Sequence, residues 1–383
     1  MWRIFISLVF ILLIIVFTSF ISSHLWAGKA EKLPGSVEIT FTEDITVAEF
    51  GKKFELDRKV LKNVFNLKAP SDLKKKVADF GMSERQLNNK LSKILAIRAE
   101  HGSKNWKKIF IKGGLWIVFL FCVLILLKKR KITARNRKWI YILAVGIFGI
   151  ILGSDPSPMG TVKDAIVLLG SRGTIFPPRL IAFSIFLLMV ILANKFICSW
   201  GCQIGTLQDL IFRLNRDPKD KKGLFGQIKI PFKISNSVRV LFFLLLTFVA
   251  FIWSMDIVEF IDPFKIFKPH VIGITGGIFI ALIMVLSLFI YRPWCHFFCP
   301  FGLIGWLAEK ISFLKIKVDY DKCIACEACS KACPSTVMDA ILKRDKIIPD
   351  CFSCGTCIES CPADAITFAS GKRQKPPKDK FDK

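Results

Sequence analysis

Residues 323–334 read CIACEACSKACP, and residues 351–362 read CFSCGTCIESCP. Each stretch spaces four cysteines as C-x2-C-x2-C-x3-C and ends in proline, which is typical of bacterial domains that bind two [4Fe–4S] clusters. Three thiolates of each cluster come from one stretch, and the fourth comes from the end of the other. A disulfide framework and two zinc sites are the alternatives, but zinc sites usually pair two CxxC units without the trailing cysteine and proline.

The motif therefore predicts two four-cysteine sites with exchanged fourth ligands. The first combines Cys323, Cys326, Cys329 and Cys361, and the second combines Cys351, Cys354, Cys357 and Cys333. Two [4Fe–4S] clusters bound in this way would make the C-terminal segment a one-electron carrier.

Most of the remaining chain is apolar, with 52% hydrophobic residues and 36 Phe against 3 Tyr in 383 residues. About 20 apolar residues cross a bilayer. Six stretches of low charge approach that length, at residues 4–22, 109–127, 139–153, 180–197, 238–254 and 271–291. We therefore expect an integral membrane all-α protein with about six transmembrane helices, rather than a large soluble protein with buried helices.

The basic residues predict the orientation of these helices. Residues 128–138 carry seven Lys and Arg and residues 198–239 carry eight, whereas residues 154–178 and 256–270 carry two each. Lys and Arg concentrate in cytoplasmic loops. We therefore expect a protein of the bacterial inner membrane, with its C-terminal domain on the cytoplasmic side. Most of the net charge of +26 is then explained by basic residues that orient the helices or contact anionic lipid headgroups. No nucleic acid partner is expected.

The expected organisation has five parts. These are an N-terminal signal-anchor transmembrane helix (1–26), a small helical extracytoplasmic domain (27–108), a membrane domain (109–316), an α+β bacterial 2[4Fe–4S] ferredoxin-like domain (317–370) and a basic disordered tail (371–383). Cleavage of the first segment is the alternative, but Ala27 and Ala30 form only a poor cleavage site.

The extracytoplasmic domain has two capping-box starts, at Thr46-x-x-Glu49 and Ser83-x-x-Gln86. We interpret this domain as either a docking platform for an extracytoplasmic redox partner or a structural cap. It has no sequence signature for covalent flavin attachment.

A second cysteine pattern repeats inside the membrane domain. Residues 198–205 read CSWGCQIG, and residues 295–302 read CHFFCPFG, 97 residues later. Each follows an apolar stretch and precedes an amphipathic one, so the two units are expected to pack as a pseudo-twofold pair at the cytoplasmic membrane surface. The cysteines brought together would be Cys198, Cys202, Cys295 and Cys299.

The CxxxC spacing favours a shared metal over disulfides. Residues i and i+4 of a helix lie about 5–6 Å apart at Cβ, which is too far for a disulfide. A third redox or metal site is therefore predicted, and soft thiolates suit copper(I) or an Fe–S cluster equally. Buried small residues are the alternative, and this is also our interpretation of Cys122.

The four histidines do not lie at the centre of any predicted span, so a b-type haem is not expected. His296, beside Cys295, is interpreted as a solvated interface residue. The loop at 154–178 is rich in turn residues and brings charges to the membrane edge, where carboxylates can accept quinol protons. The candidate quinone-side residues are Asp155, Asp164, Arg172 and Arg179, and plain turn chemistry is the alternative.

Two CxxxC motifs followed by a double [4Fe–4S] module resemble the membrane polyferredoxins of the NapH/NosR/CcoG type, over residues 139–365. The eight ferredoxin cysteines match that pattern, as do Cys198, Cys202, Cys295, Cys299 and Pro300. Gln203 stands where the family often has proline, and no flavin motif is present, so the chain is closest to the flavin-free NapH-like branch.

The resemblance implies an electron-transfer component of an oxidoreductase complex, in a respiratory chain. Its electrons would pass between the quinone pool or cytoplasmic donors and a redox subunit, such as an extracytoplasmic cytochrome or a ferredoxin-type protein. A copper-type metal reductase, a metalloenzyme assembly factor and a non-catalytic membrane docking subunit are the alternatives.

Overall fold

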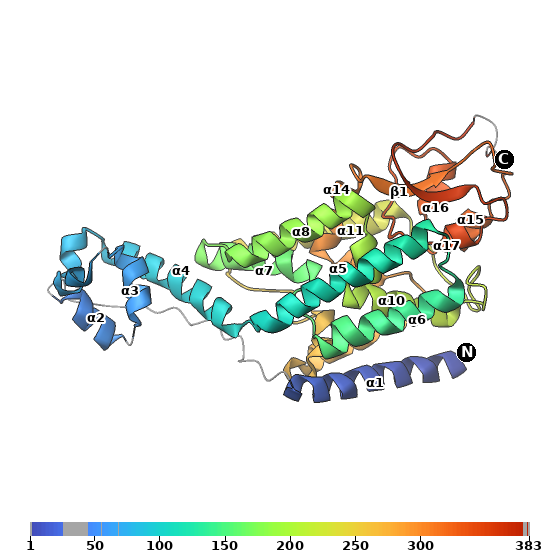
Figure 1. Ribbon diagram of the computed structural model, residues 1–383. Coiled ribbons are helices and arrows are strands. Elements are labelled where there is room, and N and C mark those ends of the chain that lie inside the picture. The colour runs from blue at the N-terminus through green and yellow to red at the C-terminus, as the bar shows by residue number, and fades with distance from the viewer. Residues whose placement is uncertain (1, 26–44, 55, 68, 378–380, 382–383) are drawn as a thin grey trace.

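A computed structural model describes residues 2–25, 45–54, 56–67, 69–377 and 381. It places a helical membrane domain between a small helical domain and a ferredoxin domain, which lie at its opposite ends (Figure 1). The alanines considered for signal cleavage, Ala27 and Ala30, lie outside the described residues.

The small domain packs three helices and two 3-10 turns around its own apolar core. They are α2 (Val47–Lys53), α3 (Arg58–Phe65), η1 (Pro70–Lys74), η2 (Val77–Phe80) and α4 (Glu84–Ser103). Both predicted capping boxes are confirmed, because Thr46 and Ser83 each exchange hydrogen bonds with the third residue of the helix that follows. Helix α4 extends away from this core and leads towards the membrane domain (Figure 1).

The membrane domain contains long helices and several short interior ones. The elements are α1 (Trp2–Leu25), α5 (Trp106–Lys128), α6 (Ala134–Ala144), the π-helical η3 (Val145–Ile151), α7 (Pro158–Arg172), α8 (Pro177–Ala193), α9 (Phe196–Trp200), α10 (Gln203–Phe212), η4 (Arg213–Asn215), α11 (Phe232–Ile252), η5 (Pro263–Phe267), η6 (Pro269–Val271), α12 (Ile274–Leu286), α13 (Pro293–Phe297) and α14 (Pro300–Glu309).

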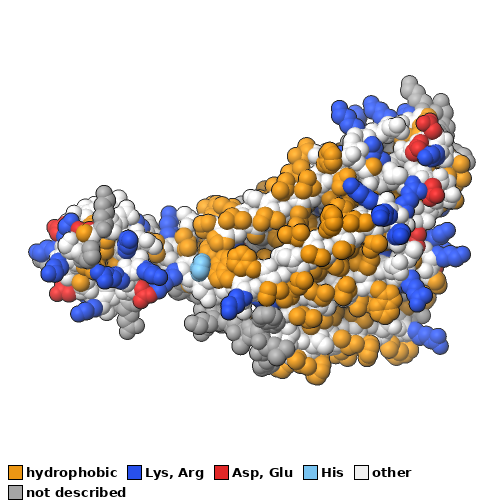
Figure 2. Space-filling model, in the orientation of Figure 1, with side chains coloured by type: hydrophobic (Ala, Val, Ile, Leu, Met, Phe, Trp, Pro, Cys, Tyr) orange, Lys and Arg blue, Asp and Glu red, His pale blue; other side chains and the backbone are white. Residues whose placement is uncertain are grey.

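Each of the six predicted spans contains a helix, but only three helices of the described chain are long and apolar enough to cross a membrane, namely α1, α5 and α11. Helices α8 and α12 are apolar but shorter, and α6 continues as η3. A broad apolar surface covers this domain, whereas Lys and Arg gather towards its ends (Figure 2). Soluble proteins rarely expose so large a continuous apolar surface to water. The chain is therefore a membrane protein.

Two predictions for the membrane domain are wrong. The turn-rich segment at 154–178 contains the 15-residue helix α7, which starts with Ser157 as N-cap and Pro158, and ends at Gly173 in the left-handed conformation. These are the residues that favour helix ends. Cys122 is exposed rather than a core residue, because the buried stripe of α5 runs through Trp116, Leu120, Val123 and Leu127 and passes it by.

The ferredoxin domain is closed by its first and last strands. Strand β1 (Leu314–Val318) pairs antiparallel with β2 (Ile366–Ser370), with Leu314 opposite Ser370. Between them lie α15 (Ala328–Ala332), α16 (Val337–Leu342) and α17 (Thr356–Glu359). The domain therefore starts at Leu314, the first residue of β1, three residues before the predicted start at residue 317.

Helices α7 and α11 cross at Gly170. A Cβ placed on this glycine would collide with the backbone carbonyl of Ala250 in α11. We predict that Gly170→Ala lowers the free energy of unfolding by about 1–3 kcal/mol, because the two backbones must separate. The matched control is Gly114→Ala in α5, where the added Cβ meets nothing within 4 Å. Thermal unfolding in detergent measures both, and equal stability of the two variants would contradict the close crossing.

Candidate metal centres

The eight ferredoxin cysteines line two separate cavities. The first, called site 1, is lined by Cys323, Cys326, Cys329 and Cys361. The second, called site 2, is lined by Cys333, Cys351, Cys354 and Cys357. The fold thus brings the fourth cysteine of each motif to the loop of the other, as cross-ligation requires. Burial raises the pKa of the Cys329 thiol to about 12, so its thiolate depends on the positive charge of a bound metal.

A third cavity, called site 3, lies in the membrane domain. Its walls include Cys198, Cys202, Cys295 and Cys299, all of them buried. The other lining residues come from elements that surround the motifs, and they are Pro158, Met159, Lys195, Ile204, Phe264, Trp294, Phe301, Gly302 and Phe352. The structure therefore brings the two CxxxC motifs together around one space, and a bound group there would be shielded from water.

The two cysteines of a CxxxC motif do not share one continuous helix, contrary to the prediction. Cys198 lies in α9, and Cys202 is the N-cap of α10. Cys295 lies in α13, and Cys299 is the N-cap of α14. The chain turns between the two cysteines, and each second cysteine faces the positive end of a ten-residue helix, which stabilises a thiolate.

The repeat is visible in the packing of its glycines. A Cβ on Gly205 would collide with the carbonyl oxygen of Cys198, and one on Gly302 would meet that of Cys295 at 2.7 Å. Each helix after the break therefore folds back onto the first cysteine of its own motif. Only glycine allows this approach in both halves.

The cation three residues before each motif contacts the other motif. Lys195 donates to the carbonyl of Gly302 at 2.6 Å, and Arg292 donates to the carbonyl of Cys198 at 2.7 Å. The two repeats are thus cross-braced. Sequence reasoning missed both residues, although a cation at the same place in each repeat was a detectable signal.

Among the described residues, no three His, Cys, Asp or Glu side chains converge as ligands of a single metal ion. The twelve cysteines instead surround their cavities at several points. Thiolates of a [4Fe–4S] cube bind separate irons at its corners, whereas a zinc ion draws its ligands to one centre. Each of the three four-cysteine cavities has the donor set that a [4Fe–4S] cluster requires.

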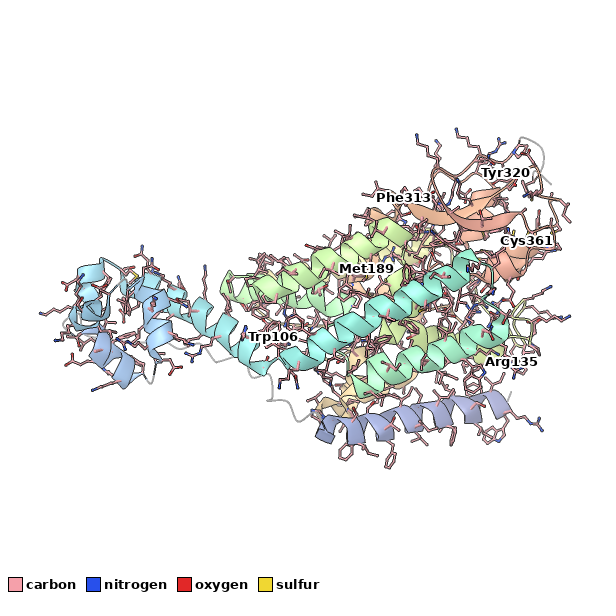
Figure 3. The ribbon with its side chains drawn as sticks, in the orientation of Figure 1. Trp106, Arg135, Met189, Phe313, Tyr320 and Cys361 are labelled. Carbon is pink, nitrogen blue, oxygen red and sulfur yellow. The ribbon has the colours of Figure 1, made fainter. Side chains whose placement is uncertain are left out.

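Site 3 lies level with the middle of α5, rather than at the membrane surface as predicted. The indole of Trp116 donates to the carbonyl of Gly201 at 3.1 Å. Trp116 lies about 15 Å along the helix from Trp106, at a rise of 1.5 Å per residue. Figure 3 marks Trp106 at the end of α5 towards the small domain and Cys361 in the ferredoxin domain beyond the other end.

Helix α10 is buried over its whole length, although its sequence predicts an amphipathic interfacial helix. Its Asp209 carboxylate accepts four hydrogen bonds. The donors are Tyr141 and Tyr291 at 2.9 Å, Arg213 at 2.7 Å and Arg292 at 2.6 Å. Buried carboxylates are tolerated only when paired and hydrogen-bonded in this way, so α10 belongs inside the protein and not at the lipid interface.

The second cysteine stretch of the ferredoxin domain is fixed to the membrane domain. Asp350 pairs with Lys195 and, at 2.9 Å, with Arg239. Burial alone would raise the pKa of Asp350, but these two cations hold it at about 2. Trp200 donates to the carbonyl of Ser353 at 3.2 Å. Site 2 is therefore the ferredoxin cavity that faces site 3.

Phe352 lines both site 2 and site 3. Its ring is 4% exposed and packs against Tyr291 and His296, with centroid distances of 5.8 and 5.4 Å. The guanidinium carbon of Arg292 lies 4.7 Å from its centroid. One side chain thus forms the wall between the two cavities, and no motif other than its place after Cys351 predicts this role.

His296 is half-buried between aromatic rings rather than solvated. Its Nδ1 lies 3.1 Å from the carbonyl oxygen of Arg292. This packing explains why the solvated interpretation was wrong.

Three of the four candidate quinone-side residues surround one cavity of about 90 Å³, here called the outer pocket. Asp155, Asp164 and Arg179 line it, together with Trp106 and other apolar residues. Asp164 pairs with Lys163 at 2.8 Å and also with Arg179. Arg172, at the C-terminus of α7, does not line this pocket.

Known proteins share both cysteine patterns. A family model described as a 4Fe-4S dicluster domain matches residues 315–362, and one described as a 4Fe-4S binding domain matches residues 175–224 and again 272–319. The second model therefore recognises the two CxxxC halves as repeats. No solved structure matches the chain.

Curated relatives point to the same class. YccM of Escherichia coli strain K12, named as an electron transport protein, is 29% identical over 184 residues, covering 45% of this chain and 50% of that protein. The ferredoxin-type protein NapH of Haemophilus influenzae is 27% identical over 177 residues, covering 45% and 55%. NapH of Escherichia coli strain K12 is 25% identical over 181 residues, covering 45% and 60%. The chain spans about half the length of the first of these relatives.

These matches define a protein with 4Fe–4S binding domains, similar to ferredoxin-type proteins. The prediction of a NapH-like polyferredoxin is confirmed.

The cavity linings make cross-ligation testable. We predict that Cys333→Ser removes the cluster signal of site 2 and Cys361→Ser that of site 1, because each cysteine lies in the cavity of the other motif. Electron paramagnetic resonance of the reduced variants distinguishes the two signals. Cys122→Ser is the control, since Cys122 is exposed on α5 and should change neither. Loss of the signal of the mutated motif itself would overturn the pairing.

Proposed function

We propose that the chain transfers electrons through the membrane, between a cytoplasmic ferredoxin domain and a quinone bound near the opposite face. The observation that carries this proposal is the shared wall between sites 2 and 3, formed by Phe352. When bound, [4Fe–4S] clusters supply one-electron transfer. The residues of the chain place the four-cysteine cavities next to one another and exclude water between them.

The outer pocket extends the same series. The first turn of α7 separates it from site 3, because Pro158 and Met159 line site 3 while Ser157 and Gly160 line the outer pocket. Carboxylates beside an apolar pocket are suited to accept the protons that quinol oxidation releases. This arrangement supports the quinone as the membrane-side redox partner.

The geometry of site 3 favours a third cluster over a copper-type ion. Its cysteines line a cavity without converging on one point. The cavity also lies between the ferredoxin domain and the outer pocket, which is the position of an electron carrier and not of a docking subunit alone.

The first test changes the wall residue. We predict that Phe352→Ala slows electron exchange between sites 2 and 3 several-fold, because the ring that fills the space between them is lost, while iron content stays unchanged. Phe352→Tyr keeps the ring and serves as the control. Spectroscopy after photoreduction of the ferredoxin domain measures the rate. An unchanged rate in Phe352→Ala would contradict this route.

A second test addresses the quinone. Asp164→Asn should lower quinol-linked reduction of the protein several-fold, because the outer pocket loses a carboxylate that can accept a proton. Arg172→Gln changes a charge of the same helix outside the pocket and should leave the rate unaltered. Stopped-flow absorbance with a soluble quinol measures both variants, and equal rates would argue against quinone binding here.

A third test addresses orientation, which rests on the asymmetry of basic loops. A reporter that is active only outside the cytoplasm should be active when fused at Lys104 and silent when fused after Lys372. The reverse pattern would place the ferredoxin domain outside and overturn the proposed direction.

A further inference from the structure

A further cavity, of about 390 Å³, belongs to none of the sites above. It is an open groove, here called the basic groove, between the loop that follows η4 and the ferredoxin domain. Four cations line it, namely Arg216, Lys222, Lys229 and Lys331, and its exposed apolar residues are Leu224, Phe225 and Ile228. No acidic side chain of the described chain is among its lining residues.

The basic groove lies at the end of the membrane domain that contacts the ferredoxin domain. Its loop contains Asp220, which pairs with Arg137 in the first turn of α6. The backbone N–H of Ile228 donates to the carbonyl of Phe289, just after α12, at 2.8 Å, and α11 starts at Phe232. The loop is thus fixed where three helices of the membrane domain begin or end, and helix ends are where a membrane domain meets lipid headgroups.

Three of the four cations in the groove form no ion pair with a carboxylate of the described chain. Arg216 pairs with Asp220, but among the described residues no carboxylate pairs with Lys222, Lys229 or Lys331. Lys229 donates instead to the carbonyl of Ser330 at 2.8 Å. Burial lowers the pKa of Lys229 and that of Arg216, the latter to about 10. An anion in the groove would relieve this accumulation of charge.

The apolar residues decide what kind of anion fits. Leu224, Phe225 and Ile228 are 53, 39 and 59% exposed and lie between Lys222 and Lys229 in the loop. Basic and apolar side chains at headgroup depth match a molecule with a phosphate and acyl chains. An acidic protein would pair with the lysines, but it would not explain why exposed apolar residues lie beside them.

We propose that the basic groove binds an anionic phospholipid, with its phosphate among the lysines and its acyl chains against the apolar residues. Two of the groove's cations, Lys229 and Arg216, also donate to carbonyls of the ferredoxin domain, at Ser330 and Ala332. The bound lipid therefore holds the ferredoxin domain against the membrane.

The test uses the full chain in nanodiscs of phosphatidylcholine with a minor share of phosphatidylglycerol. Native mass spectrometry counts the phosphatidylglycerol retained after transfer to detergent. Lys222→Gln/Lys229→Gln should weaken retention by roughly 10- to 30-fold, as expected for two lysines near an anionic lipid. Lys219→Gln/Lys221→Gln removes the same charge from the same loop outside the groove and should retain lipid as the unaltered protein does.

The iron content of each variant checks its folding, and Lys222→Gln alone replaces the double variant if that fails to fold. Retention that falls equally in both double variants, or in neither, would overturn the proposal. Displacement of the lipid by inorganic phosphate, or occupation of the groove only by an acidic soluble protein, would also overturn it.

Discussion

Arg292 and Lys195 cross between the two cysteine motifs of the membrane domain, and the arrangement of site 3 depends on this exchange. Each cation precedes one motif by three residues and donates to a backbone carbonyl of the other. Each is then neutralised by a buried carboxylate, Asp209 for Arg292 and Asp350 for Lys195. Removing one partner of such a buried pair typically costs about 3–5 kcal/mol, because a charge is left uncompensated.

The same charges connect the membrane domain to the ferredoxin domain. Asp350 directly precedes Cys351, so the carboxylate that neutralises Lys195 also fixes the loop of site 2. Arg213 joins Asp209 to the hydroxyl of Thr356, which lies two residues after Cys354. The positions of sites 2 and 3 are therefore set by two buried polar networks, one around Asp350 and one around Asp209. Cations beside these cavities also favour the additional negative charge of a reduced site.

Much of the ferredoxin domain follows from its sequence, because the ligands of each half are close in the chain and their spacing is fixed by the cluster they hold. The repeat of the CxxxC motifs was also detectable, since it needs only the comparison of two short stretches. Helix α7 had local signals at Ser157, Pro158 and Gly173, but the density of turn residues around them suggested a loop.

The remaining features depend on contacts between distant residues. Nothing local in α10 shows that Asp209 meets two tyrosines and Arg292 from other elements, so the helix looked interfacial. Likewise, the depth of site 3 is set by Trp116, 85 residues before Gly201. The role of Phe352 emerges only when both domains are placed together.

The central claim is that site 3 holds a third cluster between the ferredoxin domain and the outer pocket. Iron quantification of anaerobically purified protein tests it most directly. We predict about twelve irons per chain, at four per cube, and about eight in Cys198→Ala/Cys295→Ala with the signals of sites 1 and 2 retained. About eight irons in the unaltered protein, with no loss in the variant, would contradict it.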